Sequence, residues 1–277
     1  MLTSVVIPTR DTADQLLYTL FSFNLQLVDF DQFEVIVVDN ASRDETPRRI
    51  AQFSANYPLH YLRFEKRTTL HKLLREGLAQ SSGQIIVFLS SNMMVPREFV
   101  GVHQHVHQLE NKLVLVGLDT RRIYSVYDPR FSPRQHAECS EWLEQYPQIK
   151  RPYAPTKIIP LLEESQIVSG FPFHVGLPST QAIRRMAMRQ QYGPKLEGHP
   201  APWTFFQLSH VSLSRRAIQQ AGGCKALPRR KLEQEIGKRL WKHGYQFQFA
   251  DKLTLLWQER VIQDVPPRRT GKNHRRV

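Results

Sequence analysis

Three short polar segments of the sequence have residue types that can bind a polar ligand, and each directly follows an apolar run. The segments are Pro8–Asp11, Asp39–Ser42 and Ser90–Val95. They supply carboxylates, a guanidinium group, hydroxyls and an amide. Because ligands bind in the crevice outside the carboxyl ends of the strands in open α/β sheets, these segments are the candidate binding loops.

The apolar runs that precede these loops have the length and composition of buried strands. They alternate with segments whose apolar residues recur at helical spacing, which predicts an α/β fold with a mainly parallel sheet flanked by helices. We expect strands over Ser4–Ile7, Phe33–Val38, Leu59–Phe64, Ile85–Leu89 and Leu113–Leu118.

Helix starts are indicated between these strands. Thr12 with Gln15, and Ser42 with Glu45, have the spacing of a capping box, and Pro96 suits the first turn of a helix. A further helix is expected from Leu70 to Leu78, before the strand that ends at Leu89.

The pattern becomes irregular over residues 119–204, which are rich in Pro, Arg, Tyr and His. A long irregular stretch inside a compact protein is typical of a functional lid or insertion. Regular elements then return, with a strand expected over Phe205–Leu213, helices over 214–221 and Arg230–His243, and strands over Tyr245–Ala250 and Leu253–Trp257.

Composition excludes several classes of protein. Hydrophobic residues make up 41% of the 277 residues, which excludes an intrinsically disordered chain. The two cysteines, Cys139 and Cys224, make a disulfide scaffold or a cysteine-based zinc site improbable. There is no apolar stretch of membrane-spanning length and no signal-peptide pattern at the N-terminus, so a cytoplasmic location is expected.

The chain is strongly basic, with 38 Lys and Arg against 25 Asp and Glu, a formal net charge of +13. Such a balance is typical of proteins that meet phosphate, as nucleic acid, lipid head group or nucleotide. No nucleic-acid-binding motif is recognisable, so nucleic acid is not favoured. The basic C-terminal tail, residues 261–277, leaves open a peripheral contact with an anionic surface such as a membrane.

Four segments together resemble a known family. SVVIPTRD, FEVIVVDNASRDET and GLAQSSGQIIVFLSSNMMVP are similar to the first half of a family-two glycosyltransferase of the GT-A fold, and AGGCKALPRRKLEQEIGKRLWKHGYQF is similar to its acceptor-side segment. The resemblance implies a nucleotide-sugar-binding half over 1–118 and an acceptor-side half of the same domain over 205–260. The irregular insertion at 119–204 would then be a lid or acceptor region.

The resemblance also implies which residues contact the donor. The positions that match its nucleotide contacts are Pro8, Thr9, Arg10, Asp11 and Asp39. A carboxylate such as Asp39 can accept a hydrogen bond from a uracil N3–H, and Arg10 can face phosphate. The alternative for Asp39–Ser42 is turn and cap chemistry, because Asp, Asn and Ser all favour such places.

The sequence departs from the family where a metal would bind. The family implies a divalent cation, Mn²⁺ or Mg²⁺, held by an Asp-X-Asp sequence, but the matching positions are Ser90, Ser91 and Asn92. These donors carry no charge, whereas hard cations prefer anionic oxygen ligands. The family's late metal-binding histidine is also missing from Leu253–Trp257. We therefore predict no standard metal site.

The resemblance places a catalytic base at the start of the second acceptor-side helix. Its Glu-Asp pair matches Leu232 and Glu233, so Glu233 is the candidate general base that deprotonates an acceptor hydroxyl. The alternative is a solvated helix charge, like Glu235 beside it. Basic groups could replace the metal on the leaving diphosphate. The candidates on the donor and acceptor sides are Arg10, Arg67, Lys72, Arg75, Arg229, Arg230 and Lys231.

Two other patterns have simpler explanations. His103 and His107 are four residues apart on a predicted helix, with His105 between them, and a helix surface explains them better than a metal site. The aromatic residues of the irregular region could form a sugar platform, although core packing is the commoner role. They are Trp142, Tyr146, Tyr153, Phe171, Phe173 and Trp203.

Two functional hypotheses follow. The first is a glycosyltransferase that moves a sugar from a nucleotide-sugar donor, a UDP-sugar by the resemblance, to a hydroxyl of an unknown glycan, lipid or protein acceptor. By the same resemblance the reaction inverts the anomeric configuration. The second is a catalytically inactive GT-A-like module that binds or scaffolds.

Overall fold

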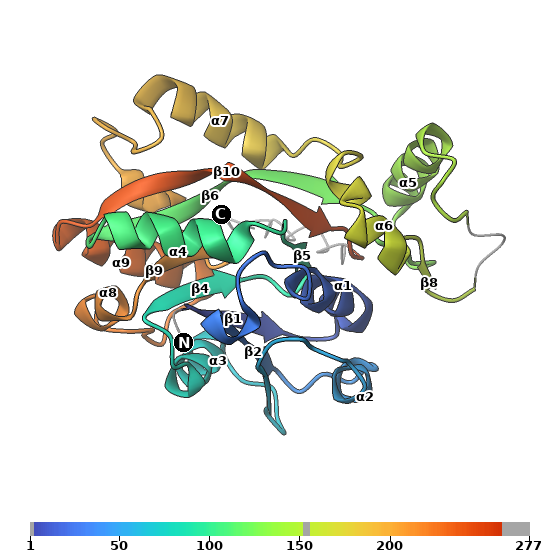
Figure 1. The fold of residues 1–277 in the computed structure, drawn as a ribbon, viewed down its shortest axis with the longest axis horizontal. Helices are drawn as coiled ribbons and strands as arrows, with labels where there is room; N and C mark the ends of the chain where they lie inside the picture. Colours follow the sequence, from blue (N-terminus) through green and yellow to red (C-terminus); the bar gives the residue numbers. More distant parts are fainter. Residues whose placement is uncertain (1–2, 152–155, 262–277) are drawn as a thin grey trace, which may run out of the picture.

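The computed structural model describes residues 3–151 and 156–261, and Figure 1 shows their fold. Within these residues one sheet of eight strands forms the centre of the molecule. Its strands are β1 (Thr3–Thr9), β2 (Phe33–Asp39), β3 (Leu59–Arg63), β4 (Ile85–Leu89), β5 (Met93–Met94), β6 (Leu113–Ile123), β9 (His210–Ser214) and β10 (Gln246–Gln258). Of the predicted tail, 261–277, only residue 261 is described, and residues 262–277 lie outside the described residues.

The spatial order of the sheet is β3-β2-β1-β4-β9-β6-β10-β5. β1 runs parallel to β2 and β4, β3 is parallel to β2, and β6 is parallel to β10. β9 is antiparallel to both β4 and β6, and the short β5 is antiparallel to β10. The sheet is therefore mixed and mostly parallel, which confirms the predicted fold class.

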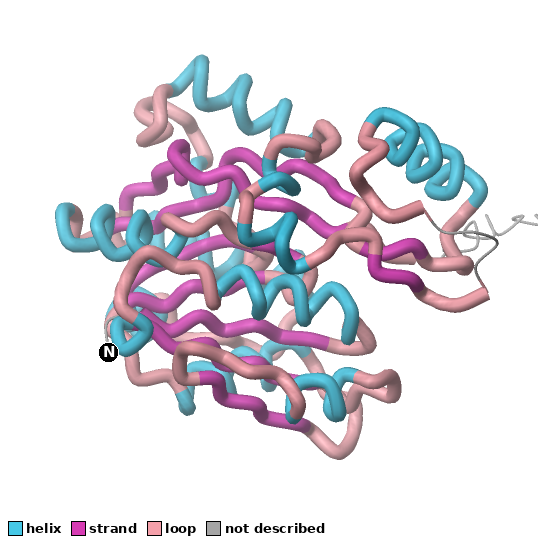
Figure 2. Tube along the Cα trace, turned by 45° about the vertical axis from the view of Figure 1, so that its right-hand side comes forward, coloured by secondary structure: helices cyan, strands magenta, loops and turns pink. Residues whose placement is uncertain are grey.

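Helices cover both faces of this sheet, and Figure 2 shows the strands as the middle layer. The α-helices are α1 (Ala13–Phe23), α2 (Thr46–Ala51), α3 (Leu70–Gln80), α4 (Phe99–Leu109), α5 (Pro133–Gln145), α6 (Glu164–Val168), α7 (Thr180–Tyr192), α8 (Arg215–Gln220) and α9 (Arg229–Lys242). Single turns of 3₁₀-helix are η1 (Phe30–Gln32), η2 (Phe171–Phe173) and η3 (Pro202–Phe205). In the described residues no helix has the length and apolar character needed to cross a membrane.

The sheet separates two hydrophobic cores, one on each face, because successive side chains of a strand point to opposite sides. Val5 and Ile7 of β1 pack with α1 and α4, whereas Val6 between them packs with α3, α8 and α9. All three side chains are fully buried. Strands that are buried on both faces read as continuous apolar runs, and this is why β1, β2 and β4 were predictable.

A third core lies where the ends of β5, β6 and β10 meet the part of the molecule that carries α5 and α6 (Figure 1). A small two-stranded sheet of β7 (Val126–Tyr127) and β8 (Ile159–Pro160) belongs to this region. Trp142 of α5 is 1% exposed, and its indole N–H donates to the Val175 carbonyl at 2.9 Å. Trp142 therefore packs in this core and is no open sugar platform.

Several predicted element boundaries need correction. Only the C-terminal half of the predicted strand over Phe205–Leu213 is a strand, since β9 begins at His210. Phe205 lies in η3 instead. The two last predicted strands are one strand, β10, whose register with β6 shifts between Ala250 and Thr254. The polar residues Asp251 and Lys252 occupy this irregularity, and for that reason the sequence pattern appeared interrupted.

The prediction that a helix surface explains the histidines of α4 is wrong for His103. This side chain is fully buried, and its Nε2 lies 3.1 Å from Nε2 of His210 on β9. Ser212 Oγ lies within hydrogen-bond distance of ring nitrogens of both His103 and His107, at 2.7 and 2.8 Å. Burial lowers the pKa of His107 to about 4 and that of His210 to about 3.

Candidate active site

The loops after β1, β2 and β4 meet at one edge of the sheet. Thr9 is the register partner of Asp39, and the Asn40 N–H donates to the Thr9 carbonyl at 3.0 Å. The Thr12 hydroxyl lies 2.8 Å from the Thr9 hydroxyl and 3.1 Å from that of Ser91. The structure thus brings the predicted donor residues of all three loops into one neighbourhood.

Asp39 ends β2 and is fully buried. Its Oδ1 accepts hydrogen bonds from the Ser42 N–H (3.0 Å) and hydroxyl, and its Oδ2 accepts one from the Tyr61 hydroxyl at 2.6 Å. Arg63 Nε lies 3.7 Å from Oδ2. These contacts match the turn chemistry that was the alternative for this segment, and the role of Asp39 toward a nucleotide base stays a prediction.

Tyr61 is a site residue that the sequence did not indicate. It lies on β3, and only the pairing of β2 with β3 brings its hydroxyl to Asp39. Burial, followed by the hydrogen bond to Asp39, raises the pKa of the Tyr61 phenol. The phenol therefore stays protonated near neutral pH and donates to the carboxylate.

Ser42 connects the loops after β1 and β2. Its hydroxyl donates to Asp39 and accepts from the Asp11 N–H at 2.9 Å, while Asp11 Oδ1 accepts from the Arg43 N–H at 2.7 Å. Asp11 has a φ of 49°, a left-handed conformation that Asp tolerates better than most residues. Arg10 Nε lies 3.3 Å from Asp11 Oδ2, so this guanidinium is held at the same edge.

Both predicted capping boxes are wrong, because their hydroxyls are used by the loops. Thr12 precedes α1 but makes no cap hydrogen bond, and the Ala13 N–H donates instead to Asp44 Oδ2 at 2.9 Å. Ser42 lies before α2, whose N-cap is Glu45 and has no side-chain cap hydrogen bond. Each hydroxyl binds one partner in its own loop, Thr9 or Asp39, and one in a loop more than 30 residues away, which local spacing could not show.

The segment after β4 is neutral and mostly buried. Asn92 is 2% exposed, and its side-chain amide donates to the Gln258 carbonyl at 2.8 Å. The Ser91 carbonyl accepts from the Thr19 hydroxyl at 2.9 Å, and the Ser90 N–H donates to the Ser209 carbonyl at 3.0 Å. Asn92 thus ties the end of β10 to this loop, and Ser90 alone of the three is partly exposed.

Glu233 lies in the first turns of α9, with 15% of its side chain exposed. Its Oε1 accepts from the Leu208 N–H at 3.0 Å and from Arg229 Nε at 3.2 Å. Leu208 adjoins Ser209, whose carbonyl binds the Ser90 N–H. Glu233 is therefore next to the backbone that holds the β4 loop, unlike Glu235, whose side chain is 43% exposed.

The residues at the family's metal positions do not fit a hard divalent cation. Ser90 and Ser91 offer neutral hydroxyls, and Asn92 offers a neutral amide oxygen on a side chain whose NH2 group donates to the Gln258 carbonyl of β10. In the described part of the chain, no group of three His, Cys, Asp or Glu side chains could hold a metal ion. Neutral oxygens are weak ligands for Mg²⁺ or Mn²⁺.

Known proteins are similar to the chain in sequence. The chain is 28% identical over 265 residues to the uncharacterized glycosyltransferase YfnE of Bacillus subtilis (strain 168), across 94% of this chain and 65% of that protein. It is 29% identical over 100 residues to dolichol-phosphate mannosyltransferase of Pyrococcus furiosus, across 36% of this chain and 28% of that protein. The chain thus spans less than two thirds of either relative.

Two solved structures have the same fold at low sequence identity. Residues 1–349 of S. aureus TarS in complex with UDP-GlcNAc match with a TM-score of 0.62 and 13% identity, covering 95% of this chain and 60% of that one. The mannosyltransferase PcManGT from Pyrobaculum calidifontis in complex with GDP-Man and Mn²⁺ matches with a TM-score of 0.57 and 15% identity, covering 96% and 57%. The fold is therefore the GT-A fold of these transferases.

The family model described as glycosyl transferase family 2 matches residues 4–190. This range contains the three loops at the sheet edge and most of the irregular region. The chain belongs to glycosyl transferase family 2.

Proposed function

We propose that the protein transfers a sugar from a UDP-sugar to a hydroxyl of an acceptor. The observation that carries the proposal is the meeting of the loops after β1, β2 and β4 at one edge of the sheet, in a chain of this family. Pro8, Thr9, Arg10 and Asp11 would face the nucleotide phosphates and ribose, and Asp39 the base. The UDP-GlcNAc complex of TarS and the GDP-Man complex of PcManGT support a nucleotide-sugar donor.

Glu233 is the proposed general base. It would take the proton of the acceptor hydroxyl, whose oxygen then attacks the anomeric carbon while the bond to the diphosphate breaks. Attack from the face opposite the leaving group inverts the anomeric configuration. The hydrogen bonds from Leu208 and Arg229 support this role, because they fix the orientation of the carboxylate.

We propose that Ser90–Asn92 is a degenerate Asp-X-Asp motif. The diphosphate would then leave without a divalent metal ion held by this motif. The support is the neutral, partly buried segment Ser90, Ser91 and Asn92. Charge-assisted hydrogen bonds from Arg10 and the strand-end backbone would then stabilise the developing negative charge. The side chain of Arg10 is 34% exposed, so its guanidinium can reach a ligand at this edge.

Calorimetric titration of the protein with UDP and several UDP-sugars, in Mn²⁺ and in EDTA, tests both proposals. Binding that is equal under the two conditions supports metal independence, whereas binding that needs Mn²⁺ contradicts it. Absence of binding to every nucleotide in both buffers contradicts the transferase.

A second candidate is a binding module that has lost turnover. The neutral residues at the family's metal positions favour it, because a diphosphate leaving group needs a counter-charge. Nucleotide binding without any transfer or donor hydrolysis is the result that identifies it. Ser90→Asp with Asn92→Asp should leave such a module inactive.

A further inference from the structure

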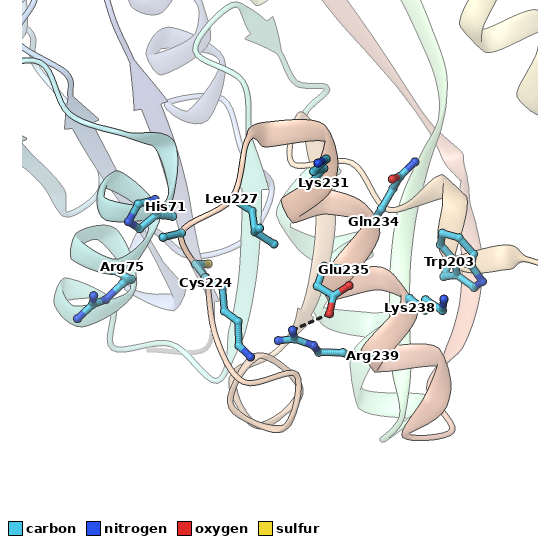
Figure 3. A pocket seen from close by; sticks show the side chains of 12 residues that line it. His71, Arg75, Trp203, Cys224, Leu227, Lys231, Gln234, Glu235, Lys238 and Arg239 are labelled. Atoms are coloured by element: carbon cyan, nitrogen blue, oxygen red, sulfur yellow. Dashed lines mark hydrogen bonds and ion pairs between the residues drawn. The ribbon is translucent and has the colours of Figure 1, made fainter.

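A pocket of about 820 Å³ lies between α3 and α9, away from the loops at the sheet edge (Figure 3). The loop that joins α8 to α9 forms its middle. Cationic side chains line it from α3, from this loop and from α9, and Figure 3 shows Arg75 and Arg239 on opposite sides of the loop. The cations are Arg75, Lys225, Lys231, Lys238 and Arg239, and His71 of α3 lines the pocket beside them.

These cations are poorly balanced by negative charge. The acidic residue that lines the pocket is Glu235, and it accepts a hydrogen bond from Arg239 at 2.6 Å. That hydrogen bond, with the charges of Lys225 and Lys238 nearby, holds the pKa of Glu235 below its usual value. Among the described residues, Arg75 and Lys231 form no ion pair. The pocket therefore has a surplus of cations.

The pocket also has apolar surface and a fixed aromatic wall. Trp203 of η3 lines it, with Lys238 Nζ 5.9 Å from the centroid of its ring, and Leu227 lines it from the loop. η3 lies directly against α9 at Gly237, where an added Cβ would be 2.6 Å from the Trp203 carbonyl oxygen. This close approach holds the indole beside the cations, and an aromatic face can pack against the C–H groups of a sugar or polyol.

The pocket is separate from the proposed donor loops and shares α9 with the proposed base. None of the predicted donor residues, from Pro8–Asp11 to Ser90–Asn92, lines it. Glu233 does not line it either, because Lys231 and Glu235 are each two residues from Glu233 and side chains two apart on a helix do not face the same side. The link to the acceptor is α9 itself, which belongs to the segment that resembles the acceptor side of the family.

We propose that this pocket binds a phosphate ester carried by the acceptor, with the adjoining sugar or polyol against Trp203. The acceptor assignment rests on the proposed function, whereas the phosphate site does not. A single carboxylate would neutralise one cation, but a phosphomonoester or a run of phosphodiesters can engage several. Recognition of the acceptor by charge would explain why the cations gather here and not at the β4 loop.

Inorganic tripolyphosphate is the probe, titrated calorimetrically in saturating UDP so that the donor site is filled. The test variant is Arg75→Gln with Lys238→Gln. The matched control is Arg134→Gln with Lys242→Gln, which removes the same charge from exposed positions outside the pocket. We expect the pocket variant to lose at least tenfold in affinity and the control to change less than twofold. Equal losses, or no loss, would overturn the proposal.

Two further arms separate the alternatives. Sedimentation with vesicles of phosphatidylcholine and phosphatidylglycerol at 3:1 tests a lipid head group, and vesicle binding without tripolyphosphate binding overturns the proposal. Titration with tripolyphosphate in the presence and absence of UDP tests whether the probe binds in the donor site instead. Displacement of tripolyphosphate by UDP would also overturn the proposal. Failure of UDP to bind, with tripolyphosphate binding retained, contradicts the proposed transferase but leaves the phosphate pocket standing.

Discussion

Asp39 and Glu233 are carboxylates that already accept hydrogen bonds from the protein. Asp39 has three donors and an arginine within 3.7 Å, and Glu233 has a backbone N–H and Arg229. Such bonds fix the direction of a carboxylate, so a ligand bound there, as proposed, would meet a group that needs no reordering. Substitutions that keep the shape but remove the charge test these residues best.

Glu233→Gln keeps an oxygen that can accept from the Leu208 N–H but removes the carboxylate that we propose as the base. We expect the transfer rate to fall at least 100-fold, within the range that general-base catalysis supplies, with UDP affinity unchanged. Turnover assays with calorimetry measure both quantities. Glu144→Gln on α5, an exposed position, is the control and should change neither. Unchanged turnover in Glu233→Gln would reject the assignment.

Comparison of two single variants, Asp39→Asn and Tyr61→Phe, separates nucleotide recognition from packing. Tyr61→Phe removes one hydrogen bond to the carboxylate, so it should cost about 1 kcal/mol of unfolding free energy and leave UDP affinity nearly unchanged. Asp39→Asn removes the charge itself and should lower UDP affinity about tenfold. Denaturant unfolding and calorimetry measure the two effects. Equal losses of affinity would mean that Asp39 acts only through the loop structure.

At the scale of elements, close contact between helix and sheet positions the loops. α3 lies so near β1 that a Cβ added at Gly77 would be 2.5 Å from Val6 Cγ1. The backbone of Gly77 is helical, a conformation that any residue can adopt. Glycine is therefore required at this position because there is no space for a Cβ atom. The contact fixes α3 against the strand that carries the first predicted donor loop, and it fixes one wall of the basic pocket.

Gly77→Ala should destabilise the protein by about 1–3 kcal/mol, because the new methyl group overlaps a buried valine. Gly101→Ala on α4 is the matched control, since its added Cβ meets only Val28 Cγ1 at 3.4 Å. That variant should be neutral or gain up to about 1 kcal/mol from helix propensity. Denaturant unfolding measures both, and equal stabilities would contradict the packing argument.

At the scale of the whole molecule, a cluster of buried histidines lies where β9 and α4 meet. Gly117 of β6 makes room for it, because a Cβ there would be 2.5 Å from His210 Nδ1. Burial lowers the pKa of His103, His107 and His210 below the usual value of 6.5. The folded protein therefore holds these rings neutral.

Stability should fall as the pH is lowered from about 6.5 toward 4. In that window the unfolded chain binds protons that the folded protein excludes, and each such histidine contributes roughly 1 kcal/mol per pH unit. Unfolding free energies at pH 7.5, 6.0 and 5.0 at constant ionic strength measure the slope. His107→Gln should reduce it, whereas the exposed His105→Gln should not. A flat profile would contradict this interpretation.

Local sequence alone determined the buried parallel strands of the first half of the chain and the resemblance to the family. Ile85–Leu89 is β4 to the residue, and the runs at β1 and β2 were located because strands buried on both faces are apolar without a break. The loops that follow these strands could also be identified as the candidate site. Parallel strands end at a common edge of the sheet, so the order of strands and loops in the sequence predicts that these loops lie close together.

The partners of the site residues were decided only by the tertiary structure. Thr12 and Ser42 make hydrogen bonds between loops in place of the expected helix caps. The Tyr61 hydroxyl donates to Asp39, and Glu233 accepts from the Leu208 N–H beside the β4 loop. The basic pocket likewise joins α3, which ends at Gln80, to α9, which begins at Arg229. Hydrogen bonds and charge act between groups that are close in space, and this closeness arises from strand order and helix packing, which spacing along the chain does not contain.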